Sequence, residues 1–196
     1  MLHFLIYDVL GTPAILVGLF SLIGLLLQKK GISDVISGTL KTIMGFVILT
    51  AGAGIISFHP ETANNKIFRL LNQIKDAGKK CGVVLNPATP AESIAEYAHL
   101  LDKVTVMSVD PGYAGQKFIP ESLNKIRKLI NMRKNNGYHY LTEIDGSCNE
   151  KTFGQIAESG VDVFIVGTSG LFSLHEDVSQ AWDRMIEIFQ RETVAA

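Results

Sequence analysis

VTVMSVDPGYAGQKFIPE, residues 104–121, joins an apolar, β-branched run to a loop with two glycines. The run predicts a strand over residues 103–109, and the amphipathic pattern from 120 to 133 predicts a helix. Between them, residues 110–116 form a loop in which the glycines permit a tight turn and backbone N–H groups can face an anion. The stretch therefore predicts one strand–loop–helix unit with a candidate anion-binding loop.

The same alternation of strand and helix extends on both sides of this unit. Short apolar runs predict further strands at residues 55–58, 82–85, 140–144 and 162–166, and amphipathic stretches predict helices at residues 63–77, 91–99, 150–159 and 174–191. Strands that alternate with helices in this way form parallel sheets. A closed (β/α)₈ barrel needs eight such units, and about five are predicted. The fold class is therefore α/β, an incomplete TIM barrel.

The loops after the last two predicted strands also carry small and hydroxyl-bearing residues. Asp-Gly-Ser at 145–147 follows the fourth strand, and Gly-Thr-Ser-Gly at 167–170 follows the fifth. Barrels commonly bind phosphate groups with the loops after their last two strands. A single glycine loop is usually a plain turn, but three such loops after consecutive strands predict a phosphate site.

The N-terminal part of the chain has a different composition. Residues 1–57 hold five charged side chains, namely Asp8, Lys29, Lys30, Asp34 and Lys41. The uncharged run at 9–27 approaches, at about 1.5 Å per residue, the roughly 30 Å thickness of a bilayer core. A signal peptide would place basic residues before the run, and a core helix would show a polar stripe, so a membrane span is favoured over both.

A second apolar stretch, residues 42–58, is marginal as a span because the glycine-rich residues 51–54 interrupt it. One or two apolar, membrane-spanning helices are therefore predicted before the barrel. Lys29 and Lys30 follow the first run directly, so the positive-inside rule predicts a membrane-associated chain whose C-terminal part is cytoplasmic if the first run spans alone.

The net charge and the two cysteines limit the partners and the cysteine chemistry that can be expected. The net charge of −1 offers no electrostatic reason to expect a nucleic-acid partner. Cys81 and Cys148 are in no metal-ligand spacing, which predicts reduced thiols rather than a disulfide scaffold.

Five motifs resemble those of the ribulose-phosphate 3-epimerase family: FHPET (58–62), VVLNPATP (83–90), the opening stretch, EIDGSCN (143–149) and VDVFIVGTSGLF (161–172). The resemblance runs from Ile55 to about Phe189, and the motif sequences are closest to those of the allulose-6-phosphate 3-epimerase branch. It implies epimerisation of a pentulose or hexulose phosphate by proton transfer beside a ketone. A divalent ion (zinc, manganese, iron or cobalt) would assist by stabilising the enediolate.

The resemblance also implies roles for individual residues. Asp145 would be both an acid/base group and a metal ligand. The phosphate would be bound by the three loops, at Gly112, Tyr113, Ala114, Gly115, Gln116, Gly146, Ser147, Gly167, Thr168 and Ser169. The remaining substrate pocket would include His59, Asn86 and Met107.

In the family, two histidines and two aspartates hold the metal. Asp145 matches one aspartate, whereas the other three ligands belong to the first three strands of the family and have no counterpart in this sequence. Glu143, two positions earlier, is expected on the same face of the strand. Because one carboxylate cannot hold a divalent ion against water, we expect epimerase descent with impaired or absent turnover. The open sheet edges of a partial barrel also favour self-association.

Residues 1–54 resemble the N-terminus of the ascorbate-type membrane subunit of the phosphotransferase system, chiefly in GTLKTIMGF (38–46) and AGAG (51–54). The expected organisation is thus a transporter-like membrane segment (1–54) joined to the C-terminal part of an epimerase barrel (55–196). Two alternatives to an epimerase remain: a membrane-anchored phosphosugar-binding remnant, and a non-functional fusion product of a phosphotransferase-system permease.

Overall fold

The computed structural model describes residues 21–23, 27–28, 35, 39, 54–63, 65–113 and 115–194. The chain divides into two compact units, Met1–Gly54 and Ile55–Ala196, and only the second is described at length. Within the described residues, no helix is both long and apolar enough to cross a membrane. The predicted span at 9–27 lies almost wholly outside them and stays a prediction.

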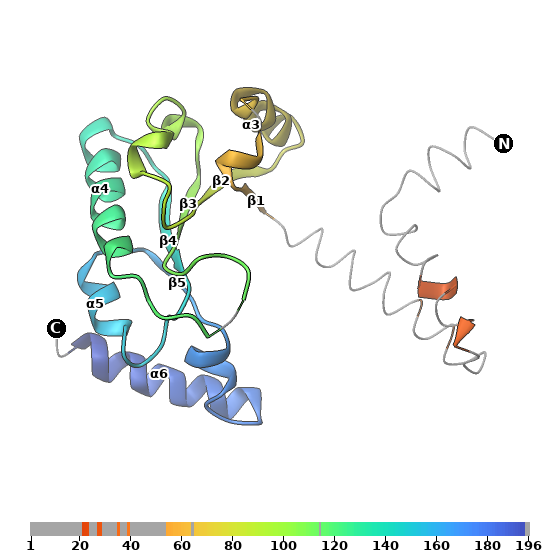
Figure 1. The fold of residues 1–196 in the computed structure, drawn as a ribbon, viewed down its shortest axis with the longest axis vertical. Helices are drawn as coiled ribbons and strands as arrows, with labels where there is room; N and C mark the ends of the chain where they lie inside the picture. The colour runs from red at the N-terminus through yellow and green to blue at the C-terminus, as the bar shows by residue number, and fades with distance from the viewer. Residues whose placement is uncertain are drawn as a thin grey trace. The chain divides into compact units, whose positions relative to one another are not determined.

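The second unit is built on a five-stranded parallel sheet (Figure 1). Its strands are β1 (Ile55–Phe58), β2 (Lys80–Leu85), β3 (Lys103–Met107), β4 (Leu141–Asp145) and β5 (Val163–Ile165). They lie side by side in chain order, each pairing in parallel with the next. This arrangement confirms the predicted α/β fold and is consistent with part of a TIM barrel.

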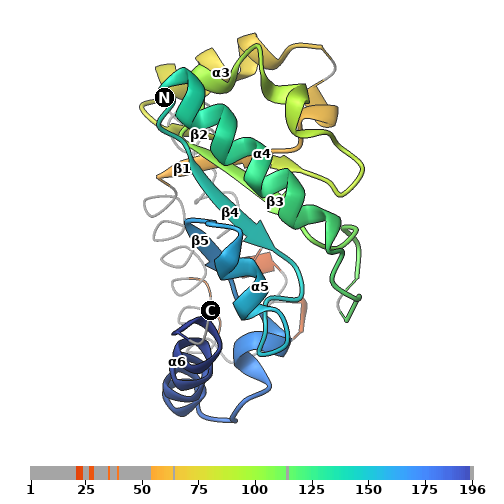
Figure 2. The same ribbon diagram turned by 90° about the vertical axis from the view of Figure 1, so that its left-hand side faces the viewer.

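Helices connect the strands and cover one face of the sheet. The α-helices are α3 (Ile67–Asp76), α4 (Glu121–Asn136), α5 (Phe153–Glu158) and α6 (Val178–Val194). Helix α3 packs against β2, α4 against β3 and β4, and α5 against α6. Figure 2 shows α4 lying across the strands. Gly137 ends α4 with a left-handed φ of 67°, a conformation that glycine adopts without strain.

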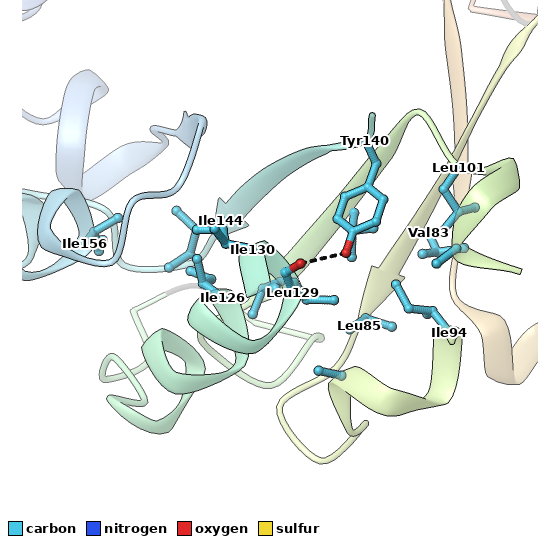
Figure 3. Packing of buried hydrophobic residues seen from close by; sticks show 14 of the residues in the cluster. Val83, Leu85, Ile94, Leu101, Ile126, Leu129, Ile130, Tyr140, Ile144 and Ile156 are labelled. Atoms are coloured by element: carbon cyan, nitrogen blue, oxygen red, sulfur yellow. Dashed lines mark hydrogen bonds between the residues drawn. The ribbon is translucent and has the colours of Figure 1, made fainter. Parts of the chain in front are cut away.

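The core lies between one face of the sheet and the helices that cover it, α4 among them (Figure 3). Alternate strand residues, including Val83, Leu85 and Ile144, are completely buried on this face of the sheet. The hydroxyl of Tyr140 is buried with them and donates a hydrogen bond to the Leu129 carbonyl at 2.7 Å. Because strand side chains alternate, the intervening residues must point to the opposite face. That face corresponds to the interior of a barrel.

The predicted helix at 91–99 is wrong in type. The structure has two short 3₁₀ helices, η3 (Ala91–Ile94) and η4 (Ala98–Leu100). Ala91, Ile94 and Tyr97 are buried at intervals of three residues, which matches the repeat of a 3₁₀ helix.

The predicted helix at 63–77 also begins too early. A 3₁₀ turn, η2 (Pro60–Ala63), comes first, and α3 starts only at Ile67.

Candidate functional site

Three loops leave the sheet at the same level because of the strand register. Asp145, the last residue of β4, pairs with Met107 at the end of β3 and with Ile165 at the end of β5. The loops that follow these strands therefore start side by side and line a cavity of about 710 Å³.

The cavity brings together most of the predicted phosphate-binding residues. Its lining includes Tyr113, Gly115, Gln116, Asp145, Gly146, Ser147, Gly167, Thr168 and Ser169. Gly112 lies in the same β3 loop, outside the lining, and Ala114 is outside the described residues.

The loop after β3 is shaped by two glycines and one glutamine. Gly112 and Gly115 have φ values of 137° and 83°, a region that residues with a Cβ rarely adopt. The Gln116 side-chain amide donates to the backbone carbonyls of Asp110 and Tyr113. The loop is therefore braced from within by Gln116.

The loop after β4 packs tightly at its first residue. Gly146 has a φ of 118°, and a Cβ there would lie 2.7 Å from Val109 Cγ2 and 2.9 Å from Ser108 Oγ. The next residue, Ser147, donates from Oγ to the carbonyl of Gln116 at 2.5 Å. This hydrogen bond ties the β4 loop to the β3 loop.

The loop after β5 lies close to the β4 loop. A Cβ at Gly170 would approach the Cys148 carbonyl oxygen to 2.1 Å, so only glycine fits there. Gly167, by contrast, has open space at its Cβ position and lines the cavity. Between them, Thr168 and Ser169 bring two hydroxyl groups to the lining.

The lining offers hydroxyl and amide groups but no basic side chain. None of the described residues around the cavity is a lysine, arginine or histidine. An anion bound here would be held by backbone N–H groups and by the hydroxyls of Thr168 and Ser169, because the Ser147 hydroxyl already donates to the Gln116 carbonyl. Such arrangements of peptide dipoles are common anion sites in proteins.

Asp145 is the carboxylate of this cavity. It is half-buried, and burial raises its pKa; the nearby charge of Glu143 raises the pKa further, against smaller opposing effects of the Gly146 N–H and Lys103. Glu143 is itself buried and forms an ion pair, since Lys103 Nζ and Thr105 Oγ1 each lie 2.7 Å from its Oε1. Asp145 thus has a shifted proton affinity at the edge of the cavity, which suits a group that exchanges protons.

A divalent metal is a poorer fit to these residues. Across the described part of the chain, no three His, Cys, Asp or Glu side chains gather closely enough to hold an ion. Glu143 is committed to Lys103, which leaves Asp145 as a single anionic ligand. The residues described here therefore do not form a divalent-metal site by themselves.

Three residues predicted for the substrate pocket do not line the cavity. His59 follows β1, Asn86 follows β2, and Met107 ends β3. The Asn86 carbonyl accepts a hydrogen bond from Lys125 Nζ at 2.6 Å, and its side-chain amide lies 3.5 Å from Glu61 Oε1. The structure thus places His59 and Asn86 in the loops of the neighbouring strands β1 and β2.

Several residues of the lining were not predicted from the sequence. They are Val109, Cys148, Asn149, Ile165 and Ser173. Cys148 and Asn149 belong to the EIDGSCN motif, so the motif itself was a signal for both. Burial, and then the charge of Asp145, raise the pKa of the Cys148 thiol to about 12. Cys148 is therefore protonated at neutral pH and a weak nucleophile.

Comparisons with known proteins agree with this architecture. A family model described as the ribulose-phosphate 3 epimerase family matches residues 41–172, beginning before Ile55. The ribulose-phosphate 3-epimerase of Escherichia coli (strain K12) is 41% identical over 119 residues, covering 61% of this chain and 52% of that protein. That of Aquifex aeolicus (strain VF5) is 42% identical over 130 residues, covering 66% and 58%. The chain spans about half the length of the curated relatives it matches.

Proposed function

Because this chain belongs to the ribulose-phosphate 3-epimerase family, we propose that its cavity binds the phosphate group of a pentulose phosphate. The observation that carries this proposal is the convergence of three glycine- and hydroxyl-containing loops at the carboxyl ends of β3, β4 and β5. A phosphate dianion needs several N–H and O–H donors, and these loops can supply them without a cation. The volume of about 710 Å³ leaves room for the sugar beside the phosphate.

The same cavity contains one candidate acid/base group for epimerisation. Epimerisation beside a ketone removes a proton from one face of the carbon and returns a proton to the other, so it needs two acid/base groups. We propose Asp145 as one of these groups, because it borders the cavity and its pKa is raised by burial.

We propose no second acid/base group among the described residues. The family generally uses a divalent metal, but the described residues offer Asp145 as a lone ligand. The proposal is therefore phosphosugar binding with little or no turnover by this chain alone.

Isothermal titration calorimetry of the purified chain tests the binding. Ribulose 5-phosphate and inorganic phosphate should both bind weakly, and prior treatment with a chelator should leave both affinities unchanged. A protein that binds neither ligand would contradict the proposal. A coupled assay for 3-epimerisation provides the second test, and turnover restored by added zinc or manganese would show that further metal ligands are supplied.

A hexulose phosphate is a second candidate ligand. It rests on the sequences of three motifs that resemble those of the allulose-6-phosphate 3-epimerase branch: DPGYAGQ (110–116), EIDGSCN (143–149) and VGTSGLF (166–172). Titration of allulose 6-phosphate against ribulose 5-phosphate distinguishes the two. The tighter ligand identifies the sugar for which the cavity is suited.

We also propose that residues 9–27 anchor the chain in a membrane and leave the epimerase-like unit in the cytoplasm. This rests on the uncharged run and the lysines that follow it. Fractionation of expressing cells tests the anchor: the chain should sediment with membranes and resist extraction by high salt. Recovery in the supernatant after centrifugation would contradict it.

A further inference from the structure

Asn149 lies where the loops after β4 and β5 meet. Its Nδ2 donates to the Ser147 carbonyl at 3.1 Å and to Ser169 Oγ at 3.2 Å, while its Oδ1 accepts from the Lys151 N–H at 3.1 Å. The orientation of the amide follows from its partners: a backbone N–H can only donate, and a carbonyl can only accept. One side chain therefore joins two loops that are about 20 residues apart in sequence.

Ser147 extends this connection to the third loop. Its hydroxyl donates to the Gln116 carbonyl in the β3 loop, at 2.5 Å. Its backbone has a φ of 50°, a left-handed conformation that is costly for a residue with a Cβ. Such a conformation persists where neighbouring contacts hold it, and here Asn149 and Thr152 Oγ1 both donate to the Ser147 carbonyl.

We propose that Asn149 is a positioning residue that joins the three loops, through Ser147 and Ser169, into one preformed phosphate-binding site. This inference rests on the proposed function. Since no described residue of the lining is basic, the attraction for phosphate comes from dipoles whose value depends on their alignment. Losing Asn149 would leave those loops to be ordered when the ligand binds, and this ordering lowers affinity.

The test is calorimetry on the full chain carrying Asn149→Ala. Affinities for inorganic phosphate and for ribulose 5-phosphate should fall by the same factor, about tenfold, because the side chain acts on the phosphate end of either ligand. Asn136→Ala is the matched control. Asn136 also donates from its amide to one carbonyl, that of Met132 on α4, away from the cavity, so its loss should leave both affinities unchanged.

A double-mutant cycle separates positioning from a general effect on the fold. Ser169 is exposed, so Ser169→Ala should fold like the parent protein while losing its contact with Asn149. In the combined variant the loss of affinity should be smaller than the sum of the two single losses, because both changes break one connection. Purely additive losses, or equal affinities for Asn149→Ala and the parent chain, would overturn the role of Asn149. A parent chain that binds neither ligand would instead refute the proposed function as well.

Discussion

The glycines around the cavity differ in what a side chain would meet. At Gly146 and Gly170 an added Cβ would come within 3 Å of Val109 and of the Cys148 carbonyl, respectively. At Gly167 the Cβ position is open, and the residue borders the cavity. Gly167 is therefore the position at which a side chain can fill the cavity without disturbing the packing around it.

Gly167→Leu should abolish phosphate binding and leave the fold intact. The leucine would occupy space that the ligand needs, while its Cβ would have no heavy atom within 4 Å to displace. Calorimetry with inorganic phosphate and a thermal melt together measure the two effects. Gly54→Leu is the control, since its Cβ position is equally open but lies outside the cavity. Unchanged binding in Gly167→Leu would place the ligand elsewhere.

Asp145→Asn should leave phosphate affinity nearly unchanged. The phosphate is assigned to backbone N–H and hydroxyl groups, and Asp145 as a carboxylate can offer it no donor. The substitution keeps the volume of the side chain and removes its negative charge. Titration of the parent chain and of Asp145→Asn with ribulose 5-phosphate is the measurement. A tenfold or greater loss in Asp145→Asn would show that the carboxyl group itself binds the ligand.

At the scale of the secondary-structure elements, one ionic cluster joins α4, β4 and the start of β5. Asp162 accepts hydrogen bonds from Arg133 near the end of α4 and from both the N–H and the hydroxyl of Thr142 in β4. Burial alone would raise the pKa of Asp162, but these hydrogen bonds together with the charge of Arg133 outweigh it and lower the pKa. The ionised carboxylate therefore holds the β4–β5 connection in place.

Asp162→Asn should destabilise the fold at neutral pH by about 1–2 kcal/mol, as expected for the loss of charge-assisted hydrogen bonds near the surface. Folding lowers the pKa of Asp162, so ionised Asp162 raises the free energy of unfolding. This contribution is complete above the pKa of the unfolded chain, about 3.9, and is lost as the pH falls through the lower pKa of the folded chain. Urea unfolding at pH 7 and at pH 3 measures this. The difference in free energy of unfolding between Asp162→Asn and the parent chain should be smaller at pH 3 than at pH 7. A difference that does not depend on pH would contradict the stabilising role of the ionised carboxylate.

The strands were more predictable from the sequence than the helices were. Each β-branched run bounded by turn residues became a strand within about two residues of its predicted ends. The segment from Ala91 to Leu100 was not predictable, because its apolar spacing fits both an α-helix and successive 3₁₀ turns. The packing of Ile94 and Tyr97 against the sheet favours the second.

The candidate site was predictable as three loops but not as a connected unit. Glycine and hydroxyl residues after consecutive strands identify the loops, since parallel strands place their carboxyl ends at one edge. The contacts of Asn149 with Ser169, and of Ser147 with Gln116, depend on how loops distant in sequence approach one another. Nothing in the local pattern around Asn149 specifies these partners.

At the scale of the whole unit Ile55–Ala196, the sheet has two lateral edges. In the part of the chain that the structure describes, β1 pairs only with β2, and β5 pairs only with β4. Apolar side chains are exposed at both edges: Ile56 of β1 is 41% exposed and Ile165 of β5 is 36% exposed. Exposed strand edges with apolar side chains are templates for pairing with another chain.

Residues 55–196 expressed alone should therefore self-associate in a concentration-dependent manner. Ile56→Lys should shift the equilibrium toward the monomer, because a charge on an edge strand opposes pairing with a second edge. Sedimentation velocity over a range of concentrations measures the effect. Leu141→Lys is the matched control: Leu141 is 45% exposed but belongs to β4, which is paired on both sides, so its substitution should leave association unchanged. A monodisperse monomer with a cooperative melt, or equal effects of the two lysines, would show that the sheet edges are not the surface of association.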